Sequence, residues 1–141
     1  MTKFFTLLPL AFALPLSACP QDFAQLTEAL SRDLHHYLNR SYTQLGKGLQ
    51  AQAVSFPELS PLPIQEADPT VKQLFLTVNH RRSGELRVEP QTYWLFLVQT
   101  PKGWRLAMAF TRIAAAPPMD VSDGALAAAV RTWLRDNCYE Y

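Results

Sequence analysis

Two cysteines and three histidines are the side chains of this 141-residue chain best suited to covalent or metal chemistry. His35 and His36 are adjacent, and adjacent side chains of a helix point about 100° apart, so they cannot chelate one ion. His80 stands at a predicted hairpin end. Cys138 would need a neighbouring base to act as a nucleophile, and no catalytic motif supplies one. The sequence therefore predicts no catalytic site, no metal site and no cofactor, which leaves Cys19 as the residue of interest.

Residues 1–18 have the pattern of a signal peptide. Lys3 precedes a mostly apolar run over residues 4–16, and two small residues follow. A membrane-spanning helix needs about 20 apolar residues, and two prolines would interrupt one here. The alternative is a buried N-terminal helix. We expect export, removal of this segment, and a single domain over residues 19–141.

The segment Leu16-Ser17-Ala18-Cys19 resembles the lipobox of bacterial lipoproteins, a leucine and two small residues before an invariant cysteine. The resemblance implies that the Cys19 thiol receives a diacylglyceryl group and becomes the acylated N-terminus. Each buried methylene contributes about 0.8 kcal/mol, so two or three acyl chains hold a protein on a bilayer. Membrane lipid would then be a partner, and the protein would be anchored in the periplasm or at the cell surface.

Cys138 offers Cys19 a different fate. Both thiols would reach an oxidising compartment, and a Cys19–Cys138 disulfide would be worth about 4 to 5 kcal/mol by loop-closure entropy. A thioether leaves no thiol to oxidise, so acylation and the disulfide exclude each other, and two free thiols are the third alternative. With the disulfide, the protein would be soluble in the periplasm or thylakoid lumen, or secreted.

The expected mature chain is formally neutral, because loss of Lys3 leaves twelve basic and twelve acidic residues. Nucleic-acid-binding proteins normally carry a basic excess, so we expect no nucleic-acid partner. The charge is uneven, since residues 72–112 hold seven basic and two acidic side chains. A solvated surface explains this excess, and an anionic partner is the alternative.

The elements that must position these residues follow from the apolar spacing. Apolar residues recur every three or four positions over 23–45 and over 126–134, which predicts two amphipathic helices. Strand patterns lie between them, three clear and one weak (49–56), and four prolines make 57–69 a crossing loop. The prediction is an α+β fold: an N-terminal helix, a three- to four-stranded antiparallel meander sheet and a C-terminal helix, with both helices on the core face.

The segment Thr100-Pro101-Lys102-Gly103 has the pattern of a tight turn that sets the register of the last two strands. With Thr100 opposite Gly103, one face of the sheet becomes the core, formed by Tyr93, Leu95 and Leu97 opposite Phe110, Met108 and Leu106. On the other face, Trp94 and Phe96 then lie opposite alanines.

Large aromatic side chains opposite alanines would leave a shallow apolar depression, with Phe75 on the neighbouring strand and Arg105 at one end. Phe75, Trp94, Phe96 and Arg105 are therefore the candidate ligand face, suited to an apolar or anionic small molecule or to a protein partner. The alternative is that the 57–69 segment or a helix covers these aromatic residues.

Three stretches carry a resemblance to a known family: CPQDFAQLTEALSRDLHHYLNR, YWLFLVQTPKGWRLAMAF and AVRTWLRDNC. Together they are similar to an uncharacterised family of small exported proteins of cyanobacteria. The resemblance implies compartment and fold rather than chemistry. Members of that family carry cysteines at both ends, which favours the disulfide, whereas the lipobox favours acylation.

The sequence thus predicts a small exported lipoprotein, anchored through Cys19, that acts as a non-catalytic binding or accessory module at a membrane surface. The alternative is a soluble exported domain with a Cys19–Cys138 disulfide that binds an apolar or anionic small molecule on its sheet.

Overall fold

The computed structural model describes residue 19 and residues 22–63, 70–113 and 115–138. The predicted signal peptide and the 64–69 part of the crossing loop lie outside the described residues. The elements are α1 (Phe23–Gln44), β1 (Leu49–Ser55), β2 (Val71–Arg82), β3 (Val88–Thr100), β4 (Gly103–Arg112), β5 (Met119–Asp120) and α2 (Ala125–Cys138).

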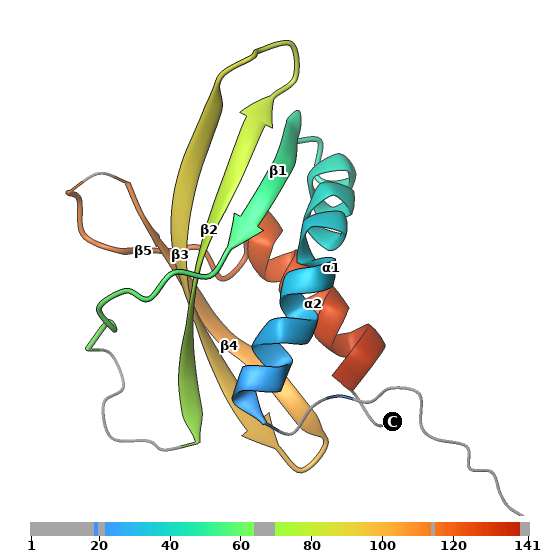
Figure 1. Cartoon of the computed structure of the whole chain (residues 1–141), viewed down its shortest axis with the longest axis vertical. Coiled ribbons are helices and arrows are strands. Elements are labelled where there is room, and N and C mark those ends of the chain that lie inside the picture. Colours follow the sequence, from blue (N-terminus) through green and yellow to red (C-terminus); the bar gives the residue numbers. More distant parts are fainter. Residues whose placement is uncertain (1–18, 20–21, 64–69, 114, 139–141) are drawn as a thin grey trace, which may run out of the picture.

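The strands form one antiparallel sheet in chain order, β1 to β5, and both helices lie against the same face (Figure 1). This confirms the predicted α+β fold, with five strands rather than three or four. The additional strand, β5, pairs Met119 and Asp120 with Thr111 and Phe110. Two residues are too few to produce an alternating pattern, and the preceding prolines indicate a loop. This strand could therefore not be predicted from the sequence.

The first helix, predicted over residues 23–45, is observed over Phe23–Gln44. The Asp22 side chain accepts a hydrogen bond of 3.3 Å from the Ala24 backbone N–H, which caps one of the amide groups left free at a helix start. The chain leaves the helix after Gln44, and Gly46 adopts a left-handed conformation (φ 63°) that glycine tolerates without steric cost. Four leucines at a spacing of four residues (26, 30, 34 and 38) make its buried stripe.

The main core lies between this stripe, α2 and the helix side of the sheet. Val130, Trp133 and Leu134 of α2 are all almost completely buried there. The two helices are also joined by polar contacts, because the Trp133 indole N–H donates to Asp33 (2.9 Å) and the Ser41 hydroxyl donates to the Ala125 carbonyl (2.8 Å). Apolar burial holds the helix pair on the sheet, and these hydrogen bonds join the two helices to each other.

An amide side chain closes the open edge of the sheet. Asn39 of α1 accepts a hydrogen bond from the Ala51 backbone N–H (2.7 Å) and donates one to the Ala51 carbonyl (3.3 Å). It therefore takes the place of a neighbouring strand at this residue of β1, satisfying groups that an edge strand would leave unpaired.

Strands β3 and β4 pair as predicted only near their turn. Thr100 lies opposite Gly103 and Leu97 opposite Leu106, but the next residue, Phe96, lies opposite Met108. Ala107 is thus an extra residue, a β-bulge on β4. Because side chains alternate between the faces of a strand, the bulge transfers every later side chain of β4 to the face opposite the predicted one.

The predicted core face is consequently wrong beyond the bulge. Ala109 is buried on the helix side, whereas Met108 and Phe110, predicted to face the core, belong to a small cluster on the other side. Trp94 and Phe96 lie opposite Phe110 and Met108 rather than opposite alanines. The Phe96 and Phe110 rings meet edge to face, 5.7 Å between centroids, and fill space that alanines would have left open.

Candidate functional site

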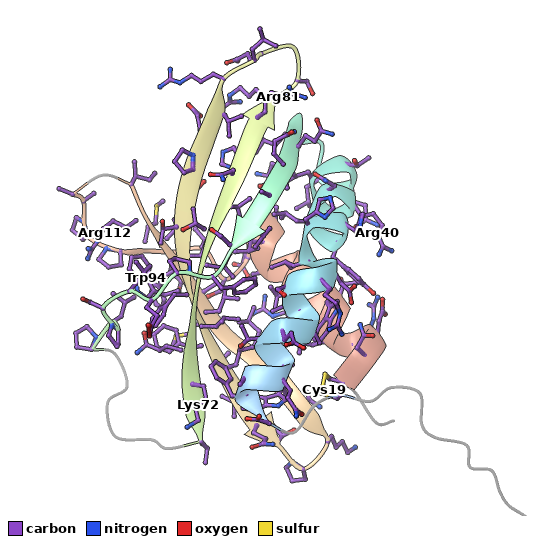
Figure 2. All side chains as sticks on the ribbon, in the orientation of Figure 1. Cys19, Arg40, Lys72, Arg81, Trp94 and Arg112 are labelled. Atoms are coloured by element: carbon purple, nitrogen blue, oxygen red, sulfur yellow. A yellow bond between two sulfur atoms is a disulfide. The ribbon has the colours of Figure 1, made fainter. Side chains whose placement is uncertain are left out.

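Cys19 and Cys138 form a disulfide, with their Cα atoms 4.5 Å apart. The bond fastens the chain shortly before α1 to the last residue of α2, as Figure 2 shows. It closes a span of 119 residues, for which loop-closure entropy gives a stabilisation of about 4 to 5 kcal/mol. Of the three fates that the sequence leaves open for Cys19, the structure contains the disulfide, and a sulfur in that bond cannot carry an acyl chain.

The same end of the molecule packs tightly around the β3–β4 turn. Gly103 has φ 122°, a conformation that other residues rarely adopt, and a Cβ atom there would collide with the Cys138 carbonyl oxygen. Glycine is therefore required here for two reasons: it can adopt the backbone conformation of the turn, and it leaves room for the end of α2. The turn, the end of α2 and the disulfide therefore lie in direct contact.

The second face of the sheet is covered by a short segment, residues 57–63, which we call the strap. The Gln73 side chain accepts from the Leu62 backbone N–H (2.9 Å) and donates to its carbonyl (2.8 Å), and the Trp94 indole N–H donates to the Ser60 carbonyl (3.1 Å). Leu62 thereby lies over Trp94 and Phe96 and is itself buried. The alternative in which the proline-rich segment covers these aromatic residues is the arrangement observed, for its described part.

The four predicted ligand-face residues share the second face but do not form an open depression. Phe96 is fully buried, Trp94 keeps 6% of its surface exposed, and Phe75 is partly buried beside them. Arg105 pairs with Val98, near the turn and several residues along the sheet from Trp94. The aromatic residues therefore form a small second core, in which Trp94 and Phe96 are buried and Phe75 is partly exposed.

A hollow of about 630 Å³ lies beside Trp94. Its walls come from the strap on one side and from the neighbouring strands on the other, and include Leu59, Pro61, Thr92, Trp94 and Arg112. The walls of this hollow are partly apolar and partly polar. Concave sites of this size and mixed character suit small molecules that have both an apolar and a polar end.

Arg112 supplies the cationic group of this hollow. Its guanidinium carbon lies 5.5 Å from the centroid of the Trp94 ring, a cation–π contact, and both side chains lie on the side of the sheet away from the helices (Figure 2). Within the described parts of the chain, no carboxylate forms an ion pair with it. An exposed guanidinium beside an aromatic ring can bind a carboxylate or another oxyanion through two parallel hydrogen bonds.

Sequence reasoning missed Arg112 because of the bulge at Ala107. Regular alternation from Arg105 would place residue 112 on the helix side, and the extra residue returns it to the second face. Neither glycine nor proline marks the bulge in the sequence, so no local signal could have located it.

The histidines do not converge. His35 and His36 lie side by side on α1, their ring centroids 4.0 Å apart, whereas His80 lies on β2 against Tyr42. The Nδ1 atom of His80 is buried without a hydrogen-bond partner, and burial lowers the pKa of this imidazole. Over the described ranges, no three His, Cys, Asp or Glu side chains gather into a possible metal site.

Nor does either described helix combine the length and apolar character that crossing a membrane requires. Comparisons of the chain with protein-family models, with curated proteins and with solved structures gave no match. The cyanobacterial resemblance therefore stays a prediction, and the site must be interpreted from its own geometry.

Proposed function

We propose that the protein is an exported, non-catalytic binding module, held together by the Cys19–Cys138 disulfide, that takes a small anionic amphiphile on the second face of its sheet. The observation that carries the proposal is the hollow beside the strap, which is lined by the Trp94 ring and by the Arg112 guanidinium that lies over it. The hollow lies on the predicted face of the sheet, but Arg112 lines it rather than the predicted Arg105.

The chemistry of the walls defines the ligand class. The Trp94 indole N–H already donates to the Ser60 carbonyl, so its ring offers apolar surface rather than a hydrogen bond. Leu59 and Pro61 extend this apolar surface, and Arg112 stands beside it as a hydrogen-bond donor with a permanent charge. A carboxylate or sulfonate attached to a short hydrocarbon body satisfies both parts.

Decanoate, below the concentration at which it forms micelles, is a suitable probe. Titration of the oxidised protein should give saturable binding, followed by tryptophan fluorescence and by NMR shifts of residues around Trp94. The variant Arg112→Gln should weaken binding about tenfold or more, because a hydrogen bond to a charged group contributes about 1.5–3 kcal/mol. Decanol, which lacks the charge, should bind the native protein as weakly as decanoate binds the variant.

Arg105→Gln is the matched control, since it removes the same charge from the same face away from the hollow. Its decanoate affinity should equal that of the native protein. An equal loss in the two arginine variants would mean that the overall positive charge attracts the ligand. No saturable binding by the native protein would refute the binding site.

The lipoprotein is the second candidate, because the Leu16-Ser17-Ala18-Cys19 segment resembles a lipobox. Intact mass spectrometry of the protein from its native host distinguishes the two forms. Acylation adds several hundred daltons to the chain that begins at Cys19, whereas the disulfide removes two hydrogen atoms. Release from the membrane fraction by Cys19→Ser would support the anchor, and an unacylated disulfide form would exclude it.

A further inference from the structure

A second cavity, of about 180 Å³, lies on the helix side of the sheet, separate from the hollow beside the strap. It is enclosed by the end of α1, the start of α2 and strand β3. Leu49 and Leu126 contribute to its apolar wall, and Tyr42, Tyr93, Lys47 and Gln91 bring polar groups to it. Because Lys47 is exposed and lines the cavity, the cavity reaches the surface after the end of α1.

The two phenol groups are the unusual part of this cavity. Tyr42 and Tyr93 keep only 4% and 8% of their surfaces exposed, yet neither hydroxyl forms a hydrogen bond with any part of the chain that the structure describes. Neither hydroxyl oxygen is among the enclosed side-chain atoms that lack a partner, so both remain accessible from the cavity. Both side chains line the cavity, so a molecule that enters it can exchange hydrogen bonds with the two hydroxyls.

The polar groups around the cavity favour a ligand that accepts hydrogen bonds, and preferably one that carries a negative charge. Burial raises the pKa of Tyr42 to about 12, and burial together with the nearby Tyr42 phenol raises the pKa of Tyr93 as well. Both hydroxyls thus stay protonated at neutral pH and can donate hydrogen bonds. Lys47 adds a positive charge, and the Gln91 amide nitrogen is already bonded to the Thr111 hydroxyl (3.0 Å).

The volume limits the size of the occupant. A dry cavity of about 150 Å³ lined by apolar side chains accommodates benzene. The present cavity is slightly larger, with an apolar wall and its donors grouped on the tyrosines and the lysine. It fits a single six-membered ring with one small polar substituent.

We propose that this cavity is a second binding site, specific for a small monocyclic carboxylate whose ring fills the apolar part and whose carboxylate accepts hydrogen bonds from Tyr42 and Tyr93 near the Lys47 ammonium group. The site is independent of the hollow that contains Arg112, because the sheet separates them. It extends the protein from one binding face to two.

Benzoate is the probe, with toluene as the same ring without the charge. Binding to the full oxidised chain is measured by NMR titration, with shifts expected for residues at the end of α1 and the start of α2. Benzoate should bind more tightly than toluene. Tyr42→Phe and Tyr93→Phe each keep the ring in place and remove one hydroxyl, so each should weaken benzoate binding about tenfold while toluene affinity stays unchanged.

Tyr37→Phe is the matched control, because its hydroxyl donates to Asp136 (2.9 Å) outside this cavity. It should leave benzoate binding unchanged, as should Arg112→Gln, which tests the other hollow. Equal affinity for benzoate and toluene would overturn the carboxylate preference. Benzoate shifts centred on Trp94, or full benzoate affinity in the Tyr42→Phe and Tyr93→Phe variants, would overturn the site itself, whatever the decanoate experiment shows.

Discussion

On the helix side of the sheet, α1 and α2 cover the strands with a continuous layer of apolar side chains, and a disulfide joins the chain just before α1 to the end of α2. On the other side, the described cover is the seven-residue strap, held by three hydrogen bonds and the single buried side chain of Leu62. The two faces carry similar aromatic and aliphatic residues, but they are closed by very different amounts of structure.

This difference indicates which face of the sheet is more stable and which can open more easily. Local opening costs least where few apolar contacts are lost, so the strap should open far more readily than the helix pair. If the hollow binds the amphiphile that we propose, such a cover would allow ligands of varied length to enter beside Trp94. The proposed site between Tyr42 and Tyr93 lies in the more extensively packed layer and should therefore select its ligand by size.

The largest effect should come from removing the disulfide. Cys19→Ala combined with Cys138→Ala should lower the free energy of unfolding by about 4 kcal/mol, because the unfolded chain regains its loop entropy. Urea unfolding followed by circular dichroism measures this loss, and the native protein with a reducing agent should match the variant. Equal stability of the oxidised and reduced forms would contradict the role assigned to this bond.

Leucine truncations compare the two faces directly. Leu34 of α1 is fully buried, so the substitution Leu34→Ala should lower the free energy of unfolding by about 3 kcal/mol. The space left by the removed side chain would be surrounded by packed structure that cannot collapse into it. Leu62→Ala in the strap should cost less than half as much, because the strap can collapse onto Trp94. Equal losses in chemical unfolding would show that the strap belongs to the cooperative core.

The junction at the foot of the helix layer is tested by Gly103→Ala. This change should cost about 2 kcal/mol or more, from the backbone conformation and from the collision with the Cys138 carbonyl. Gly84→Ala is the control, because Gly84 also has a positive φ (84°) but has open space around it. Its loss in thermal or urea unfolding should be the smaller of the two.

Two amides with the same bonding pattern give a sharper comparison. Asn39 pairs with both backbone groups of Ala51, and Gln73 pairs with both groups of Leu62. Asn39→Ala should lower global stability by about 1–2 kcal/mol. Gln73→Ala should instead raise the hydrogen-exchange rate of the Leu62 amide and leave α1 protected. Faster exchange throughout α1 in the Gln73 variant would contradict the separation of the two faces.

The smallest effect concerns pH. Burial, supported by Arg82 and opposed by Glu89, lowers the pKa of His80 in the folded state, so the unfolded chain binds the proton more readily. Stability is therefore full above the unfolded pKa of about 6.5 and decreases as the pH falls below it. The decrease between about pH 7.5 and pH 5 should be absent in His80→Phe, and a His36→Phe control should retain it. A decrease of the same size in His80→Phe would assign it to other groups.

Local patterns alone determined several parts of this protein. The leucines of α1, its Asp22 cap and the turn from Thr100 to Gly103 were predictable because each depends on residues within one or two turns of chain. The α+β fold follows from the order of such elements, and the pairing of Cys19 with Cys138 was among the alternatives that composition allowed.

Only the tertiary structure decided the sites. The bulge at Ala107 places Arg112 on the same face as Trp94. The strap is held by a hydrogen bond from the Gln73 side chain to Leu62. The packing of α1 against the sheet brings Tyr42 and Tyr93 to one cavity. Each of these depends on contacts between residues far apart in the chain, whose energies are set by how whole elements pack. A single added residue in a strand changes which face a side chain occupies, and no local pattern records it.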